Sequence, residues 1–101
     1  MMSKRITWEE YDAIAGEDGH ILVDVREDSE WASGHIKNAL HIPLGALASR
    51  ARDTIANPAT PNIVCCRSGG RAAHACDVLL DLGYQSVAYV SGDAGARYDT
   101  R

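Results

Sequence analysis

Short apolar runs alternate with segments of helical composition along this chain of 101 residues. The apolar runs occupy residues 20–25, 38–42, 62–66 and 86–90, and the helical segments occupy about residues 7–15, 27–33, 44–52 and 70–82. Apolar runs of this kind are typical of strands that are covered on both faces of a sheet. The alternation therefore predicts an α/β domain with a mainly parallel sheet.

Local signals mark where some of these helices begin and end. Thr7, followed three residues later by Glu10, forms the pattern of a capping box, in which the two residues satisfy each other's free backbone N–H groups. Gly83 follows the longest helical segment and is the expected stop, because glycine adopts the left-handed conformation that ends many helices.

Length, charge and cysteine content limit the class of protein. The length fits one compact domain over residues 1–101. The net charge of −4 argues against binding to nucleic acid or to an anionic membrane surface, and no apolar run is long enough to span a bilayer. Three cysteines, two of them adjacent, do not suggest a disulfide framework. We therefore expect a cytoplasmic protein with a working thiol.

Residues 63–71, with the sequence IVCCRSGGR, join the third apolar run to the longest predicted helix. Ligands of parallel sheets bind outside the carboxyl ends of the strands, and this segment leaves such an end. Free backbone N–H groups and the positive end of the helix dipole face the segment. Gly69 and Gly70 allow several N–H groups to converge on one point, and Arg67 and Arg71 add positive charge.

These surroundings favour the thiolate form of Cys66, which follows the predicted strand directly. Thiolates are the nucleophilic form of cysteine, and they are stabilised at helix N-termini and beside arginines. Cys65 lies one residue earlier, so its side chain should point to the opposite face of the sheet and pack in the core. Cys76 lies in the apolar stripe of the helix and is also expected in the core. Cys66 is therefore the candidate nucleophile.

A series of motifs resembles the sequence pattern of rhodanese domains. The six residues 66–71, CRSGGR, are similar to the active-site loop of that family. The same pattern continues in order at residues 22–26 (LVDVR), 30–31 (EW), 34–36 (GHI), 39–44 (ALHIPL) and 82–84 (LGY). The resemblance covers about residues 5–93.

The resemblance implies a rhodanese-like three-layer α/β/α fold with a five-stranded parallel sheet. It also implies a thiosulfate sulfurtransferase in which catalytic Cys66 carries sulfane sulfur as a persulfide. The implied substrate-binding residues are Arg67, Ser68, Gly69, Gly70 and Arg71, and the implied structural residues near the site are Asp24 and Arg26. The implied partners are a small anionic sulfur donor and a thiol or cyanide acceptor, with a protein as a further candidate acceptor.

The resemblance weakens at the C-terminal end. Rhodanese domains often close with paired glycines and then a tryptophan in a final helix, whereas residues 91–98 read SGDAGARY. We expect either that Tyr98 replaces the tryptophan or that this tail packs loosely.

Two other functions remain open from the residues. Counted from Cys65, five residues separate the cysteine from Arg71, which is the spacing of cysteine-dependent phosphatase and arsenate reductase loops. Against that function, Val64 and Ala72 differ from the residues that often flank those loops. The other alternative is a non-catalytic sulfur-relay or binding module.

We predict no cofactor and no metal site. The four histidines do not pair with one another, with cysteine or with aspartate at metal-ligand spacing. His35 is expected to form a structural hydrogen bond, and Trp8 and Trp31 are expected to anchor the core. The acidic residues 27–30 are expected to be a solvated helix start.

Overall fold

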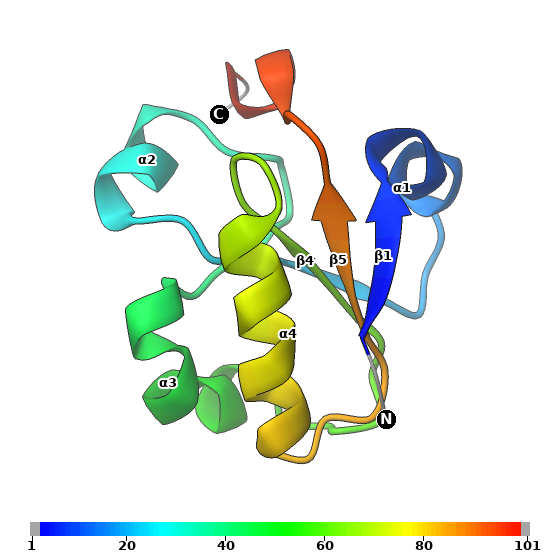
Figure 1. Ribbon diagram of the computed structural model, residues 1–101, viewed down its shortest axis with the longest axis vertical. Helices are drawn as coiled ribbons and strands as arrows, with labels where there is room; N and C mark the ends of the chain where they lie inside the picture. Colours follow the sequence, from blue (N-terminus) through cyan, green and yellow to red (C-terminus); the bar gives the residue numbers. More distant parts are fainter. Residues whose placement is uncertain (1–2, 100–101) are drawn as a thin grey trace.

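The computed structural model describes residues 3–99. Its strands are β1 (Lys4–Thr7), β2 (Ile21–Asp24), β3 (Leu40–His41), β4 (Asn62–Cys65) and β5 (Val87–Ser91). Its α-helices are α1 (Trp8–Ile14), α2 (Asp28–Ser33), α3 (Leu47–Thr54) and α4 (Gly70–Asp81), and its 3-10 helices are η1 (Leu44–Ala46) and η2 (Gly95–Asp99). Figure 1 shows these elements along the chain.

The strands form one sheet in the order β1-β5-β4-β2-β3, and every neighbouring pair is parallel. The predicted five-stranded parallel sheet is therefore confirmed. Because all strands run in the same direction, their carboxyl ends lie at one edge of the sheet. β4 is the central strand, so the loop that follows it lies in the middle of that edge.

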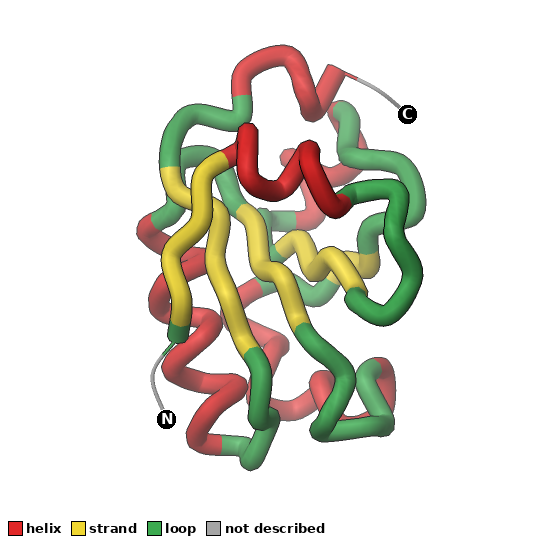
Figure 2. Tube along the Cα trace, turned by 90° about the vertical axis from the view of Figure 1, so that its right-hand side faces the viewer, coloured by secondary structure: helices red, strands yellow, loops and turns green. Residues whose placement is uncertain are grey.

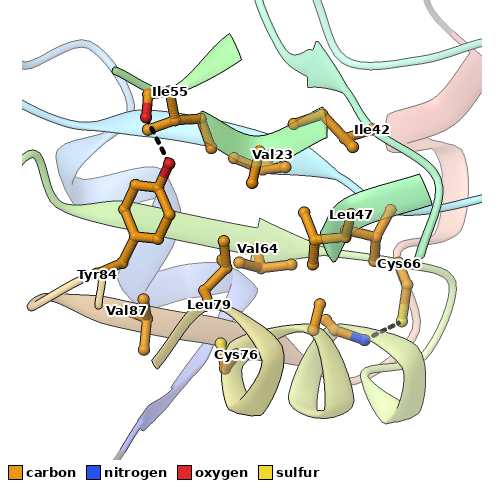
Figure 3. Packing of buried hydrophobic residues seen from close by; sticks show 14 residues of the cluster. Val23, Ile42, Leu47, Ile55, Val64, Cys66, Cys76, Leu79, Tyr84 and Val87 are labelled. Carbon is orange, nitrogen blue, oxygen red and sulfur yellow. Dashed lines mark hydrogen bonds between the residues drawn. The ribbon is translucent and has the colours of Figure 1, made fainter. Parts of the chain in front are cut away.

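Helices cover both faces of the sheet, which confirms the three-layer fold. Figures 1 and 2 show α3 and α4 on one face and α1 on the other. Side chains alternate along the strands, so Val23 and Val64 pack toward α3 and α4, whereas Leu22 and Ile63 pack toward α1. Figure 3 shows the first of these two clusters.

The predicted helix signals are present. The Thr7 Oγ1 atom accepts a hydrogen bond from the Glu10 backbone N–H at 3.1 Å, and the Glu10 carboxylate accepts one from the Thr7 N–H at 3.0 Å. Gly83 has a φ of +99° directly after α4 and its C-cap residue, as expected of a helix stop. The capping box and this glycine thus fix one end of α1 and of α4.

Three features differ from the sequence-based expectations. β1 was not predicted, because Ile6 is the only buried residue among its four and no apolar run marks it. The segment predicted as a helix from residue 44 begins with the 3-10 turn η1. Trp8 is buried as expected, but Trp31 is only half-buried. Its ring stacks between the rings of His35 and His41, with centroids 3.6 and 4.6 Å away.

Candidate active site

The loop of residues 66–69 connects β4 to α4 at the carboxyl edge of the sheet. Gly69 is the N-cap of α4 and has a φ of +116°, which favours glycine. A Cβ atom at this position would lie 3.1 Å from the Cα atom of Ser91 and 3.3 Å from the carbonyl oxygen of Val90. Glycine is therefore needed here both for the turn and for the close approach of the loop to β5.

The sulfur of Cys66 faces the beginning of α4. It accepts hydrogen bonds from the backbone N–H groups of Gly69 at 3.1 Å and Ala72 at 3.4 Å. Figure 3 shows the second of these as a dashed line from the Cys66 sulfur. Both N–H groups belong to the helix N-terminus, where amides lack intrahelical partners and the dipole is positive. This arrangement stabilises negative charge on the sulfur.

Cys66 is also deeply placed. Only 2% of the residue is exposed, and it packs at the edge of the core cluster that contains Leu47 and Ala72. The sulfur thus has apolar side chains on one side and amide hydrogens on the other.

The other two cysteines lie in the core. Cys65 is fully buried in the cluster on the opposite face of the sheet, and burial raises the pKa of its thiol. Cys76 lies on the buried face of α4, and burial raises its pKa to about 12. Both side chains are therefore neutral thiols at neutral pH. The side chain of Cys65, which a phosphatase-type mechanism would use, lies on the opposite face of the sheet from Cys66, in the cluster that contains Tyr98.

Asp24 and Arg26 form a buried ion pair beside the loop. The Arg26 Nη2 and Asp24 Oδ2 atoms are 2.9 Å apart, and Arg26 Nη2 also donates to the carbonyl oxygen of Gly34 at 2.8 Å. Burial alone would lower the pKa of Arg26, but the hydrogen bond and charge of Asp24 raise it. The pair ties the end of β2 to the turn after α2.

Arg71 contacts α2 through its guanidinium group. Its Nη1 and Nη2 atoms lie 2.6 and 3.0 Å from the two carboxylate oxygens of Glu30. The hydrogen bond from Arg71 is the largest cause that lowers the pKa of Glu30, to about 2. The sequence suggested that Arg71 faces an anionic donor and that Glu30 is simply solvated. The structure instead pairs the two residues, so the charge of Arg71 is partly compensated.

Arg67 has an exposed side chain and lines an open cavity of about 390 Å³ beside the loop. Arg26, Glu30 and Tyr98 also line this cavity, so its wall carries charges of both signs. The lining does not include Cys66. Arg67 therefore presents its positive charge to solvent beside the loop.

Sequence reasoning missed the role of residues 92–98, which we call the C-terminal segment. Tyr98 is buried, with 5% exposure, and its hydroxyl donates to the carbonyl oxygen of Cys66 at 2.9 Å. The backbone N–H groups of Ala94 and Gly92 donate to the carbonyl oxygens of Arg67 and Ser68 at 3.1 and 3.0 Å. The tail packs closely, with Tyr98 inside. The single sequence signal was the presence of an aromatic residue where the family pattern changes.

The described residues contain no group of three or more His, Cys, Asp or Glu side chains that could hold a metal ion. Within the same residues, no helix has the length and apolar character to cross a membrane. The histidine rings have other contacts: His35 Nδ1 is 3.0 Å from the carbonyl oxygen of Trp31, and His41 Nε2 is 2.8 Å from that of Arg26.

Comparison of the sequence with known proteins finds relatives with sulfurtransferase names. Thiosulfate sulfurtransferase GlpE of Pseudomonas putida is 32% identical over 89 residues, which cover 88% of this chain and 79% of that protein. The Arabidopsis thaliana protein named HIGH ARSENIC CONTENT 1, mitochondrial, is 35% identical over 91 residues and 80% of this chain. The chain spans 54% of the plant protein and 62% of a putative mitochondrial thiosulfate sulfurtransferase of Schizosaccharomyces pombe.

Solved structures show the same fold. A rhodanese-like domain protein from Staphylococcus aureus superposes with a TM-score of 0.77 at 30% identity, covering 95% of this chain and 92% of that one. A thiosulfate sulfurtransferase from Pseudomonas aeruginosa gives a TM-score of 0.78 at 22% identity and covers 91% of this chain and 18% of that one, a likeness of fold alone. The family model of the Rhodanese-like domain matches residues 7–95, which include β4, the loop and α4. The chain belongs to the rhodanese-like domain family.

Proposed function

We propose that this protein is a sulfurtransferase that carries sulfane sulfur as a persulfide on Cys66. The observation that carries the proposal is the position of the Cys66 sulfur, which accepts two amide hydrogen bonds at the N-terminus of α4. The names of relatives such as GlpE support the same class of reaction. The proposed donor is thiosulfate or a persulfide, and the proposed acceptor is cyanide or a thiol.

In the first step, the Cys66 thiolate attacks the outer sulfur of thiosulfate. A new S–S bond forms to Cys66, the S–S bond of thiosulfate breaks, and sulfite leaves with the electron pair of that bond. The step moves no proton, because it starts from the thiolate form of Cys66. The product is a persulfide on Cys66.

In the second step, the acceptor attacks the outer sulfur of the persulfide. A bond forms between the acceptor and the outer sulfur, and the S–S bond breaks with its electron pair returning to Cys66 as a thiolate. Negative charge therefore lies on the Cys66 sulfur before the first transfer and after the second, and on the outer sulfur of the persulfide between them. Fixed amide donors at this position act as they do in an oxyanion hole, where one donor contributes about 3 kcal/mol.

The surroundings of Cys66 support a small anionic donor. The 2% exposure of the residue leaves little room for a bulky group at the sulfur. Arg67 is exposed next to it and supplies positive charge at the surface. Ser68, Gly69, Gly70 and Arg71 complete the proposed substrate-binding loop. Within it, we assign Arg71 the role of holding the start of α4 against α2 through its ion pair with Glu30.

The thiols support a reducing compartment such as the cytoplasm. All three cysteines are free and buried. A persulfide cycle requires Cys66 to return to a thiolate after each transfer, which a reducing environment preserves.

The proposal is tested by the same substitution at adjacent cysteines. Cys66→Ser should abolish thiosulfate:cyanide activity, measured as thiocyanate formation. Cys65→Ser should retain most of it, because Cys65 points to the opposite face of the sheet. Thermal unfolding of both variants verifies that they are folded. Normal activity in folded Cys66→Ser would refute the proposal.

The same two variants test the alternatives. If the wild type hydrolyses an aryl phosphate or reduces arsenate, and Cys65→Ser loses that activity, the phosphatase or arsenate reductase function would be favoured. A persulfide on Cys66 without transfer to cyanide or thiols would favour a sulfur-relay module.

A further inference from the structure

Three consecutive carbonyl groups of the active-site loop are bound by the C-terminal segment. Cys66, Arg67 and Ser68 are the acceptors, and the donors are the Tyr98 hydroxyl and the backbone N–H groups of Ala94 and Gly92. The sequence separation between donors and acceptors is 24 to 32 residues, so the contacts are tertiary. The C-terminal segment therefore controls the orientation of the loop backbone.

The geometry of the peptide bond determines what this orientation does. In a trans peptide, the carbonyl of one residue and the N–H of the next point in opposite directions. No cis peptide bond occurs in residues 3–99. Binding the carbonyls of residues 66–68 to the C-terminal segment thus turns the N–H groups of residues 67–69 away from it. The last of these, Gly69 N–H, donates to the Cys66 sulfur.

Tyr98 is held from several sides. The Arg26 guanidinium lies 3.5 Å from the centroid of the Tyr98 ring, and the Trp8 ring meets it edge-on with centroids 6.4 Å apart. A Cβ atom at Gly34 would lie 1.8 Å from the Tyr98 carbonyl oxygen, so the backbone of Tyr98 also packs closely against that of Gly34. Burial raises the pKa of Tyr98, which keeps its hydroxyl a neutral donor.

We propose that Tyr98 is a positioning residue for sulfur transfer: its hydroxyl fixes the Cys66 carbonyl, and with it the backbone that carries the Cys66 sulfur. Beside it, the Gly92 N–H holds the Ser68 carbonyl and so sets the Gly69 amide that donates to this sulfur. The role rests on the proposed function of Cys66. In this proposal Tyr98 acts through the loop backbone and not by contact with the substrate. Arg26 and Asp24 act through Tyr98, because the Arg26 guanidinium covers the Tyr98 ring and Asp24 holds that guanidinium in place.

The test compares Tyr98→Phe with Tyr84→Phe. Both hydroxyls are buried and donate to a backbone carbonyl, but Tyr84 bonds Ile55, outside the active-site loop. The readouts are the pH profile of Cys66 alkylation by iodoacetamide and kcat and KM for thiosulfate, at a temperature where all variants are folded. Alkylation does not require sulfur transfer, so it reports on Tyr98 even if the proposed function is wrong.

We expect Tyr98→Phe to move the midpoint of Cys66 alkylation to higher pH and to lower kcat about tenfold with little change in KM. Tyr84→Phe should lower the unfolding temperature about as much as Tyr98→Phe does. It should leave the alkylation profile, kcat and KM unchanged. An unchanged alkylation profile in Tyr98→Phe, or an equal shift in both variants, would overturn the proposal.

A second measurement uses the wild-type protein and does not depend on a variant that folds. Alkylation of Cys66 should alter hydrogen exchange at the backbone amides of Gly92 and Ala94, because these amides bind the loop carbonyls. Exchange that is unaffected at both amides would show that the loop and the C-terminal segment are not coupled, and would contradict the proposal.

Discussion

The carboxylate of Glu30 and the guanidinium of Arg71 form a two-point ion pair that joins α2 to the first turn of α4, with N–O distances of 2.6 and 3.0 Å. The two residues are 41 positions apart in the sequence. Because Arg71 is the last residue of the active-site loop motif, the pair fixes the boundary between loop and helix. It also places the negative charge of Glu30 beside the positive charge of Arg71.

Replacing Glu30 should reveal a pH-dependent contribution to stability. Its pKa is lowered from 4.5 to about 2 in the folded protein, so its stabilising effect is present above about pH 4.5 and is lost as the pH falls toward 2. Both side chains are about one-third exposed, so Glu30→Gln should cost only about 0.5–1 kcal/mol at pH 7. Urea unfolding of Glu30→Gln and wild type between pH 7 and pH 3 measures this.

Glu9→Gln is the control for this experiment, since Glu9 is an exposed acid in the first turn of α1. Its difference from wild type should stay small over the whole range. A Glu30→Gln difference that does not shrink as the pH approaches 3 would contradict the role assigned to the ion pair.

Arg67 should contribute to the capture of an anionic donor. Its side chain is exposed at the loop, so Arg67→Ala should raise KM for thiosulfate about threefold to tenfold, which corresponds to about 1 kcal/mol for one exposed charge. The effect should decrease at high salt, because exposed charges are screened. Steady-state kinetics at two ionic strengths provides the measurement. Arg50→Ala, at an exposed position of α3, should leave KM unchanged; equal changes in both variants would indicate a general charge effect instead.

Gly34 should be intolerant of any side chain. It has a φ of +151°, and a Cβ atom there would lie 1.8 Å from the carbonyl oxygen of Tyr98. Gly34→Ala must displace the C-terminal segment, at a cost of about 3 kcal/mol in the free energy of unfolding. Gly16→Ala is the matched control, because no atom lies within 4 Å of a Cβ at that position. Denaturant unfolding that gives similar values for both variants would show that the segment can move aside freely.

Cys76 should contribute stability that disappears in alkaline solution. Burial raises its pKa from 9.0 to about 12, so the unfolded chain ionises first. Its contribution is complete below about pH 9 and is lost as the pH rises toward 12. Cys76→Ala should be destabilised by about 1–2 kcal/mol at pH 7 through lost packing, and this deficit should shrink above pH 9. A deficit that is the same at pH 8 and pH 11, measured by urea unfolding, would contradict this assignment.

The elements that the sequence predicts are those with strong local signals. The apolar strand before the loop, the capping box at Thr7 and the glycine stop at Gly83 all depend on neighbouring residues, and all are present. β1 was missed because Lys4 and Arg5 are exposed and only its pairing with β5 makes it a strand. Pairing across more than 80 residues leaves no local pattern.

The site shows the same division. The sequence predicts the strand, the tight turn with its glycines and the helix N-terminus around Cys66, because these follow one another directly along the chain. It does not show that Arg71 pairs with Glu30 or that Tyr98 binds the Cys66 carbonyl, since both contacts join distant segments. The stacking of Trp31 on His35 and His41 was also missed, although these residues lie only four and ten positions away along the chain.

The most direct test of the account is the mass of the Cys66 peptide after treatment with thiosulfate. Trypsin cleavage after Arg52 and Arg67 releases residues 53–67, and fragmentation separates Cys65 from Cys66. We expect the mass of one added sulfur atom on Cys66, removed by cyanide, and none on Cys65 or Cys76. Folded wild-type protein that gains no sulfur, or gains it on another cysteine, would contradict the central claim.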